Sequence, residues 1–395
     1  MTSRHLAPIL KSRFESFRSV YLHGPRQVGK TTLCRETFPN LPYASLENPD
    51  QRSFAVEDPR GFLAQFPGGA ILDEIQKVPT LLSYLQEIID SGRGKFVLTG
   101  SQNLLLMEGV SQTLAGRIAI LQLLPMSRAE FQERGASDPG EGRFTGVSGR
   151  GKEPRLWDEI HAGGFPEPHY KPEILRPWAE AYIATYLERD VRSLLKVHDL
   201  GLFQRFLTLC ATRSGQLLNV ASLSSDSGVS EAQCRRWLNV LQASELIFLL
   251  PPYHENLGKR LTKSPKLFFT DTGLLCRLLG INSPDILSVH PAMGPLFETF
   301  IVNEIRKCIH NRGERPAEYF WRDKTGHEVD YLLQAGTHVS AFECKASQTL
   351  SGDHFKNLSD YIDRRGVATT KGYLVYGGDV EAERRGIRTI PWWRI

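Results

Sequence analysis

Apolar residues in the first third of the chain form short continuous runs separated by stretches with helical spacing. Residues 20–22, 43–46, 70–72 and 96–99 form runs with the length and composition of buried strands. Before the first run, apolar side chains recur at helical spacing from Leu6 to Phe17. Strands that alternate with helices predict an α/β fold with a parallel sheet, whose ligand lies at the carboxyl ends of the strands.

A different order of elements is expected between residues 217 and 250. A short helix begins at Val220, a turn follows at residues 226–228, Ser230 caps a second helix, and residues 247–250 form a strand. This order is typical of a winged helix-turn-helix, whose second helix can enter a DNA groove. Basic residues mark that helix and the expected wing: Arg235, Arg236, Lys259, Arg260 and Lys263. Such modules also serve in packing or oligomerisation, so DNA contact is one of two interpretations.

The remaining segments are a connector, a helix and a second α/β region. Residues 135–154 are rich in Gly, Ser and Pro and predict a flexible connector or exposed loop. Residues 173–197 read as one long helix. In the C-terminal part, strands are expected at residues 320–322, 327–333, 341–346 and 372–376, with a helix at residues 353–364.

The loop after the first expected strand carries a phosphate-binding pattern. Residues 24–31 read GPRQVGKT and match G-x-x-x-x-G-K-[ST]. Gly24 and Gly29 let backbone N–H groups turn toward phosphates. Lys30 would reach the β and γ phosphates, and the Thr31 hydroxyl can ligate Mg²⁺. The expected set of nucleotide-binding residues is completed by Gln27, Thr32 and Ser101. The cofactors expected are therefore ATP and Mg²⁺.

Two carboxylates follow the buried run at residues 70–72. We expect Asp73 to hold Mg²⁺ together with Thr31, and Glu74 to polarise the attacking water, which makes the site hydrolytic. The next strand ends in Ser101, Gln102 and Asn103, where a polar side chain could sense the γ phosphate.

Arg117 lies just before the apolar run at residues 118–124. It is predicted to stabilise charge at the γ phosphate, in its own subunit or in a neighbour's. The alternative is a surface arginine that closes a turn. The predicted catalytic residues of the first site are thus Lys30, Glu74 and Arg117, and a homo-oligomer is expected if Arg117 acts across a subunit boundary.

A second group of charged residues lies in the C-terminal strands. Because side chains alternate across a strand, Glu343 and Lys345 share one face. Asp330 and Glu343 could bind a second divalent metal ion, while Lys345 orients or deprotonates water as a catalytic residue. An ion pair between Glu343 and Lys345 is the alternative.

Composition narrows the function classes. The chain has 395 residues and a formal net charge of +4, so nucleic acid could bind only through a local basic patch. Its 6 cysteines form no C-x-x-C pair, which argues against a disulfide framework or a structural zinc site and favours a reducing cytosol. No uncharged apolar stretch approaches the roughly 18 residues of a membrane span. We expect a soluble, cytoplasmic protein with no membrane partner.

Several strings together resemble a family of prokaryotic AAA-like P-loop ATPases joined to a C-terminal domain of unknown function with a restriction-endonuclease-like core of the PD-(D/E)xK type. The strings are GPRQVGKTT, ILDEIQKVP, LTGSQN, LAGR, GGFPEP, FFTDTGL, EVDYLL and FECKAS. The resemblance implies ATP binding and hydrolysis, a winged-helix middle and a nuclease-like tail. It also matches Glu298 to the metal-binding carboxylate on the helix before the nuclease-like strands.

Four parts are predicted: a P-loop ATPase core at residues 1–134, a linker and helical extension at 135–198, a winged helix-turn-helix at 199–264, and a restriction-endonuclease-like α/β domain at 265–395. The first hypothesis is an ATP-hydrolysing AAA-type protein that acts on or with nucleic acid and positions or gates a metal-dependent cut. The alternative is an ATP-dependent switch that binds DNA or a protein partner through a nuclease-like domain that no longer cuts. Phosphate transfer to a small substrate is less favoured, because Glu74 suits water as the acceptor.

Overall fold

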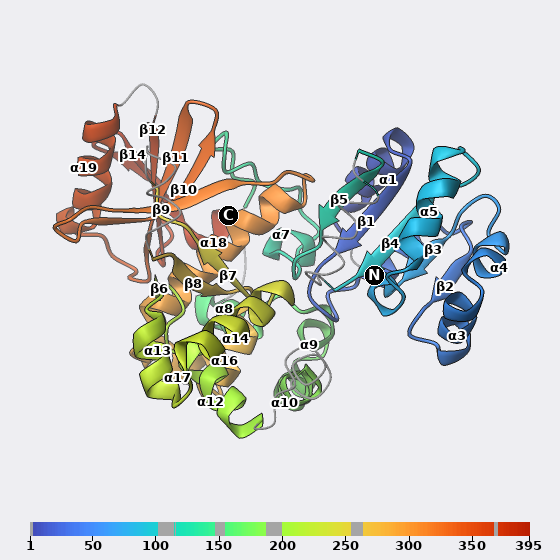
Figure 1. Ribbon diagram of the computed structural model, residues 1–395. Coiled ribbons are helices and arrows are strands. Elements are labelled where there is room, and N and C mark those ends of the chain that lie inside the picture. Colours follow the sequence, from blue (N-terminus) through green and yellow to red (C-terminus); the bar gives the residue numbers. More distant parts are fainter. Residues whose placement is uncertain are drawn as a thin grey trace. The chain divides into compact units, whose positions relative to one another are not determined.

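The computed structural model describes residues 3–101, 114, 116–146, 155–186, 200–253, 264–366 and 370–395. Their contacts separate into two compact units (Figure 1). The first unit comprises Met1–Met126, Ala243–Glu245 and His310–Glu314, and the second comprises Ser127–Gln242, Leu246–Ile309 and Arg315–Ile395. Within the described ranges, no helix combines the length and the apolarity that a membrane span requires.

The first unit contains a five-stranded parallel sheet in the order β2-β3-β4-β1-β5. Its strands are β1 (Ser19–His23), β2 (Tyr43–Ser45), β3 (Ile71–Asp73), β4 (Phe96–Gly100) and β5 (Ile118–Gln122). Its helices are α1 (Ala7–Ser16), α2 (Lys30–Thr37), α3 (Pro49–Glu57), α4 (Pro59–Ala64) and α5 (Leu81–Asp90), with a 3₁₀ turn, η1, at Ile75–Lys77. The predicted α/β fold with a parallel sheet is confirmed.

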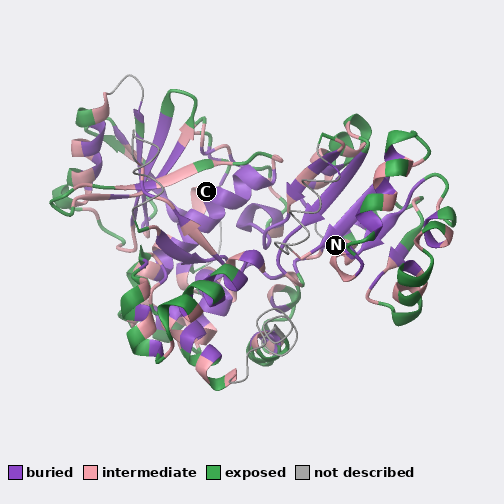
Figure 2. Ribbon diagram, in the orientation of Figure 1, coloured by how far each residue is buried: buried purple, intermediate pink, exposed green. Residues whose placement is uncertain are grey.

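Burial explains why these segments form strands and helices. Every residue of β1 and β4 is buried, as expected for strands of a parallel sheet (Figure 2). Helix α5 is amphipathic and buries one apolar face that includes Leu85 and Ile89. Asn48 and Asp58 cap α3 and α4 by accepting hydrogen bonds from backbone N–H groups, and a proline follows each of them.

The second unit contains two sheets. A three-stranded antiparallel sheet has the order β6-β8-β7, with β6 (Gln216–Leu217), β7 (Ile247–Leu250) and β8 (Lys266–Phe269). A six-stranded mixed sheet has the order β13-β14-β12-β11-β10-β9. Its strands are β9 (Ala317–Arg322), β10 (Glu328–Ala335), β11 (His338–Lys345), β12 (Thr370–Tyr376), β13 (Ala382–Arg384) and β14 (Ile387–Pro391). Strand β11 pairs antiparallel with β10 and parallel with β12.

The helices that lie wholly or mostly in the second unit precede these strands or lie between them in the sequence. They are α7 (Arg128–Phe131), α8 (Leu156–Ala162), α9 (Pro166–Tyr170), α10 (Leu175–Tyr186), α12 (Leu200–Ala211), α13 (Val220–Ser227), α14 (Glu231–Ala243), α16 (Thr272–Leu278), α17 (Pro284–Val289), α18 (Met293–His310) and α19 (Lys356–Arg365). The long helix predicted at residues 173–197 is described only as far as the end of α10, and residues 187–197 lie outside the described ranges.

The elements expected in the middle of the chain are present in the predicted order. Helix α12, strand β6, helices α13 and α14, and strands β7 and β8 follow one another, and β8 pairs with both β6 and β7. Trp237 of α14 is buried against Phe203 and Phe206 of α12. Arg235 and Arg236 of α14 are exposed. The predicted wing residues Lys259, Arg260 and Lys263 lie outside the described ranges.

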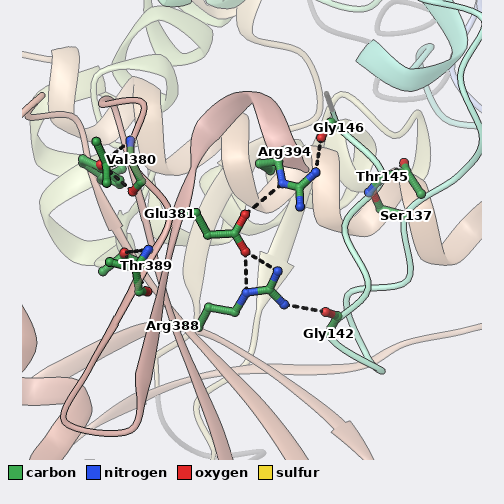
Figure 3. Close-up of polar contacts among 11 residues, drawn as sticks. Ser137, Gly142, Thr145, Gly146, Val380, Glu381, Arg388, Thr389 and Arg394 are labelled. Atoms are coloured by element: carbon green, nitrogen blue, oxygen red, sulfur yellow. Dashed lines mark hydrogen bonds and ion pairs between the residues drawn. The ribbon is translucent and has the colours of Figure 1, made fainter. Parts of the chain in front are cut away.

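The segment predicted as a flexible connector differs from that expectation over its first half. Arg388 of β14 donates a hydrogen bond to the Gly142 carbonyl oxygen at 3.1 Å, and Arg394 donates one to the Gly146 carbonyl oxygen (Figure 3). Glu381 accepts hydrogen bonds from both arginines, at 2.7 Å from Arg388 Nε and 3.1 Å from Arg394 Nε. Composition could not predict this attachment, because the acceptors are backbone carbonyls. Residues 147–154 lie outside the described ranges.

Candidate active site

The predicted phosphate-binding loop joins β1 to α2 and needs its two glycines for different reasons. Gly29 has a left-handed φ of +91° and caps α2, while no described atom would lie within 4 Å of a Cβ added there. Gly24 is needed for space, because a Cβ there would lie 2.1 Å from the carbonyl oxygen of Leu123. Gln27 has a φ of 60° and is exposed, as is Thr32. The loop thus has the curled backbone that cradles phosphates.

Lys30, the first residue of α2, turns back over this loop. Its Nζ donates hydrogen bonds to the carbonyl oxygens of Gly24 and Pro25, at 2.9 and 2.7 Å. Burial lowers the pKa of Lys30, and the carboxylates of Glu74 and Glu245 oppose that change. The ammonium group is therefore held by neutral acceptors that a phosphate oxygen could replace.

Asp73 accepts hydrogen bonds from three hydroxyl groups at the end of β3. Thr31 Oγ1 donates to Asp73 Oδ2 at 2.9 Å, and Tyr43 OH donates to the same oxygen at 2.8 Å. Thr99 Oγ1 donates to Asp73 Oδ1. The structure thus brings together Thr31 and Asp73, which the sequence assigned to Mg²⁺. It adds Tyr43 and Thr99, which lie on the neighbouring strands β2 and β4 and could be found only from the order of the sheet.

Glu74 is linked to Ser101 through a residue that the sequence analysis did not select. The side-chain amide of Gln76, in η1, donates to Glu74 Oε2 and, at 3.1 Å, to Ser101 Oγ. Glu74 itself has a left-handed φ of 58°. A Cβ at Gly100 would lie 2.2 Å from Gln76 Oε1, so this glycine makes room for the glutamine. Gln102 and Asn103 lie outside the described ranges.

A buried acid–base pair lies at the other end of the loop. Nδ1 of His23, the last residue of β1, is 2.7 Å from Oε1 of Glu245, and both side chains are buried. Glu245 belongs to the first unit although 222 residues separate it from His23. Burial, with the charges of Glu245 and Glu74, raises the pKa of Tyr21 in the same strand. No local motif could predict a pair so distant in sequence.

Arg117 forms an exposed ion pair with Asp90 at the end of α5. Its Nε and Nη2 donate to Asp90 Oδ1 and Oδ2, at 2.6 and 3.0 Å. The hydrogen bond between them raises the pKa of Arg117 and lowers that of Asp90. The Arg117 backbone N–H also donates to the Leu114 carbonyl oxygen at 3.0 Å, so the residue closes a turn. Its role at the γ phosphate stays a prediction.

The side chains around the loop fit a nucleotide and Mg²⁺. The Thr31 hydroxyl and the Asp73 carboxylate are adjacent oxygen donors of the kind that Mg²⁺ prefers. Lys30 and the N-terminus of α2 supply positive charge and N–H donors for phosphate oxygens. Thr31 and Asp73 would hold the metal ion, and Lys30 the phosphates.

The second predicted group of charged residues comes together in the interior of the second unit. Its acidic cluster consists of Glu298 of α18, Glu328 and Asp330 of β10, and Glu343 of β11. Asp330 Oδ2 accepts a hydrogen bond from the backbone N–H of Cys344 at 2.8 Å, directly beside Glu343. The predicted residues Glu298, Asp330, Glu343 and Lys345 are therefore neighbours, and Glu328 joins them although no sequence pattern marks it.

The acidic cluster contains two lysines. Nζ of Lys345 donates to Glu343 Oε1 at 2.7 Å, as the ion-pair alternative expected. Lys266, the first residue of β8, was not predicted: its Nζ lies 2.8 Å from Glu298 Oε1 and 3.8 Å from Asp330 Oδ1. It also pairs with Glu328 Oε1. Lys266 could not be recognised from the sequence, because β8 lies outside the group of C-terminal strands that carries the other charged residues.

Burial and charge act in opposite directions on this cluster. Burial raises the pKa of Glu298 against the effect of Lys266, and burial together with Asp330 raises the pKa of Glu343. For Lys266, burial lowers the pKa, but Glu298 and the other carboxylates outweigh it, so that its pKa is raised overall. The lysine is therefore an ammonium ion at neutral pH, surrounded by an excess of carboxyl groups.

The donors of this cluster do not fit a second metal ion. Across the described part of the chain, no group of three or more His, Cys, Asp or Glu side chains is arranged to hold a metal. The ammonium groups of Lys266 and Lys345 lie against the oxygens of Glu298 and Glu343 that a metal ion would need. The second divalent cofactor that the sequence suggested is therefore not supported by the geometry.

Comparisons with known proteins divide the chain into three segments. Residues 16–132 match a family described as an AAA domain, residues 153–285 a domain of unknown function (DUF8612), and residues 293–395 a domain of unknown function (DUF4143). An uncharacterized protein of Mycobacterium tuberculosis (strain ATCC 25618 / H37Rv) is 30% identical over 339 residues, which cover 84% of this chain and 71% of that protein. An uncharacterized protein of Mycobacterium bovis matches to the same extent.

The chain belongs to the same family as these mycobacterial proteins. Its residues 16–132 form an AAA-type P-loop ATPase domain. Among solved structures, the Walker-type ATPase PABY2304 of Pyrococcus abyssi is similar at 15% identity, with a TM-score of 0.43 over 69% of this chain and 94% of that chain. The ORC1 protein of Aeropyrum pernix, in complex with DNA, is similar at 13% identity, with a TM-score of 0.31 over 70% and 91%.

Proposed function

We propose that this family member hydrolyses ATP in its AAA domain and acts with nucleic acid through its middle module. The main support for ATP hydrolysis is the hydrogen bond of 2.9 Å between Thr31 Oγ1 and Asp73 Oδ2. Thr31 follows the phosphate-binding loop, and Asp73 is followed by Glu74. A hydroxyl and a carboxylate at this spacing support a Mg²⁺ site, and the adjacent Glu74 supports water as the phosphate acceptor.

Each residue of the site has a distinct task in this proposal. Bound Mg²⁺ supplies positive charge that stabilises the transferring phosphoryl group. Lys30 exchanges its neutral backbone acceptors for phosphate oxygens. Glu74 accepts a proton from the attacking water, and Gln76 fixes the direction in which the Glu74 carboxylate points. His23 and Glu245 support the end of β1 from which the loop starts.

The test of ATP hydrolysis compares Lys30→Ala and Glu74→Gln with the matched control Lys11→Ala, an exposed lysine of α1. We expect Lys30→Ala to lose nucleotide binding and turnover. Glu74→Gln should keep binding but lose about 10²- to 10⁴-fold in turnover, the usual range for a general base. Calorimetry with ATP and steady-state phosphate release give the two readings. Wild-type turnover in Glu74→Gln would remove the hydrolytic assignment.

Nucleic-acid contact is proposed for α14, the second helix of the winged-helix-like module. The order of α12, β6, α13, α14, β7 and β8, with β8 paired between β6 and β7, supports that module. The side chains of Arg235 and Arg236 interact with other side chains of the same helix. Arg235 is 64% exposed, and its Nη2 lies 3.7 Å from Glu231 Oε2. Arg236 Nη2 donates a hydrogen bond to Gln233 Oε1 at 2.7 Å. Both arginines are exposed, so a phosphate backbone could contact their guanidinium groups.

The double variant Arg235→Ala/Arg236→Ala tests this contact against Arg60→Ala, which removes an arginine that is likewise exposed and paired with a glutamate. We expect the double variant to weaken DNA binding and to reduce the salt slope by about 1 to 2, because each arginine neutralises about one phosphate. The Arg60 variant should bind as the wild type does. Equal salt slopes in all three proteins would leave α14 as a packing element.

Nucleic-acid cleavage by the C-terminal strands is the second candidate function, and it would require a metal ion to displace Lys266 and Lys345 from the carboxylate oxygens of the acidic cluster. Helix α18, the antiparallel strands β9, β10 and β11, helix α19 and the parallel strand β12 follow the order expected of a restriction-endonuclease-like core. Asp330, Glu343 and Lys345 are neighbours within it. If it cuts, Lys345→Ala should abolish cleavage and leave ATP turnover unchanged. If wild-type protein never nicks DNA with Mg²⁺ or Mn²⁺, the domain is a binding platform of an ATP-dependent switch.

A further inference from the structure

Lys266 is a buried lysine in the centre of the acidic cluster. Its side chain is 3% exposed, and its Nζ lies 5.7 Å from the centre of the Phe320 ring. It comes from β8, a strand of the three-stranded sheet, whereas Asp330 and Glu343 belong to the six-stranded sheet. A lysine this deeply buried persists only where negative groups compensate its charge.

The partners of Lys266 include Glu298 and Asp330, two of the residues that the sequence assigned to a metal ion. Its ammonium group has three N–H donors. It donates to Glu298 Oε1, pairs with Glu328, and lies 3.8 Å from Asp330 Oδ1. These carboxylates come from α18 and from β10, so the ammonium group lies where oxygens from the two elements converge. The Lys266 ammonium group thus lies at the centre of these carboxylates, in the position that a bound cation would take.

We propose that Lys266 is the resident cation of the acidic cluster and that its ammonium group excludes a divalent metal ion from it. A metal ion bound to Glu298 and Asp330 would need their oxygens at about 2.0–2.6 Å and would have to lie within a few ångströms of Nζ. The repulsion between the two cations opposes that arrangement. This role does not depend on ATP hydrolysis by the first unit, and it argues against the second candidate function.

One carboxylate oxygen of Glu343 receives no hydrogen bond from either lysine of the cluster. Glu343 Oε2 is buried and has no hydrogen-bond partner among the described residues, although Oε1 accepts from Lys345. Removal of the Lys266 charge would leave Glu298, Glu328 and Asp330 without their shared donor as well. Several converging carboxylate oxygens without a cation form the donor set that a hard divalent ion prefers.

Mn²⁺ titration followed by electron paramagnetic resonance tests the proposal on the full chain without nucleotide. An Asp73→Asn background weakens the metal site of the AAA domain, so that binding reports the acidic cluster. We expect Asp73→Asn to bind no Mn²⁺ tightly. Asp73→Asn/Lys266→Met, with an uncharged side chain of similar length, should bind about one equivalent with an affinity about tenfold higher or more, through uncompensated carboxylates. Asp73→Asn/Lys266→Arg keeps the charge and should again bind none.

The opposite result would be one equivalent of Mn²⁺ bound tightly by Asp73→Asn and lost in Asp73→Asn/Glu343→Gln. A folded Lys266→Met variant that binds no additional Mn²⁺ would also overturn the proposal. If that variant does not fold, as judged by circular dichroism, the first comparison decides alone: no tight binding by Asp73→Asn supports an internal cation, and tight binding refutes it. ATP turnover, measured separately, tests the function of the first unit.

Discussion

Thr31 Oγ1 and Asp73 Oδ2 are hydrogen-bonded at 2.9 Å, although 42 residues separate them in the sequence. The bond joins the first turn of α2 to the end of β3, because α2 begins and β3 ends at the same edge of the parallel sheet. It places the two expected Mg²⁺ ligands next to each other. The position of these two side chains is therefore set by the fold itself.

Asp73→Asn should reduce ATP turnover by about 10²-fold or more, because the metal ion loses an anionic partner worth several kcal/mol in the transition state. The matched control is Tyr43→Phe, which removes one hydrogen bond to the same carboxylate and leaves its charge in place. We expect that variant to lose less than about tenfold, the effect of one ordinary hydrogen bond. Turnover measured against Mg²⁺ concentration distinguishes the two. Equal losses would show that the hydroxyl network matters more than the charge.

Gln76→Ala should lower kcat by about tenfold and leave KM for ATP nearly unchanged, because Gln76 touches Glu74 and Ser101 and would act through them. The Gln76 amide fixes the direction of the Glu74 carboxylate. Without it, Glu74 would be oriented less well toward the attacking water, while ATP binding would be unaffected. Gln76→Asn is too short to reach both partners and should resemble alanine. A rise in KM with constant kcat would instead assign Gln76 to nucleotide binding.

Arg117→Ala and Asp90→Asn separate two roles for one arginine. If Arg117 stabilises charge at the γ phosphate, its loss should cost about 10³-fold in turnover, whereas Asp90→Asn, which breaks the same exposed ion pair, should change turnover less than about twofold. Mixing Arg117→Ala with Lys30→Ala and measuring recovered turnover tests action across a subunit boundary. Two equally small effects would leave only a surface ion pair, which contributes little to stability.

The features predicted best from the sequence are those encoded locally. The continuous runs at β1 and β4 and the glycine-lysine pattern of the loop depend on neighbouring residues, so sequence reasoning located them closely. The order of helices and strands between residues 217 and 250 was readable for the same reason, since capping residues and apolar spacing mark each helix. The pairing of Thr31 with Asp73 also followed, because a parallel sheet brings strand ends together.

The features that the sequence did not reveal depend on contacts between distant elements. Tyr43 and Thr99 reach Asp73 only because β2 and β4 flank β3 in the sheet. Glu245 and Lys266 are ordinary charged residues in their local sequence, and their buried partners make them part of a site. The same holds for the backbone carbonyls of residues 142 and 146, which composition alone assigned to a flexible connector.

Gly163→Ala should destabilise the second unit by about 3 kcal/mol, the sum of backbone strain at positive φ and an overpacked contact. Gly163 has a φ of +72°, and a Cβ there would lie 2.6 Å from Oδ1 of the buried Asp271. That carboxylate accepts hydrogen bonds from the Gly164 N–H at 2.6 Å and the Leu274 N–H at 2.8 Å, so it cannot move freely.

Gly228→Ala is the control for this substitution. Gly228 ends α13 with a similar φ of +77° but a ψ of 21°, whereas Gly163 has a ψ of −166°, a conformation that essentially only glycine adopts. No described atom would lie within 4 Å of a Cβ at Gly228. It should cost about 1 kcal/mol, the backbone term alone. Urea unfolding of both variants gives the difference. Equal losses would mean that Asp271 shifts without cost and that the glycine is needed only for its φ.

The stability of the second unit should decrease as the pH falls from about 6.5 to about 4, because of His161. Burial, with the nearby charge of Arg277, lowers the pKa of His161 from 6.5 to about 4. Its Nε2 lies 2.7 Å from Arg277 Nη2, an arrangement in which a neutral ring accepts a hydrogen bond. Since the pKa is lower in the folded state, the unfolded chain binds more protons in this pH window, and stability falls with pH.

We expect this group to contribute about 2 kcal/mol to the decrease, allowing for relaxation of a buried site. His161→Gln keeps an acceptor for Arg277 and carries no titrating ring, so its free energy of unfolding should fall less steeply between those pH values. His338→Gln, at an exposed position of β11, is the control and should follow the wild type. Urea midpoints measured across the window give the slopes. A wild-type slope in His161→Gln would assign the acid sensitivity to other groups, because the substitution removes the only proton that His161 can gain.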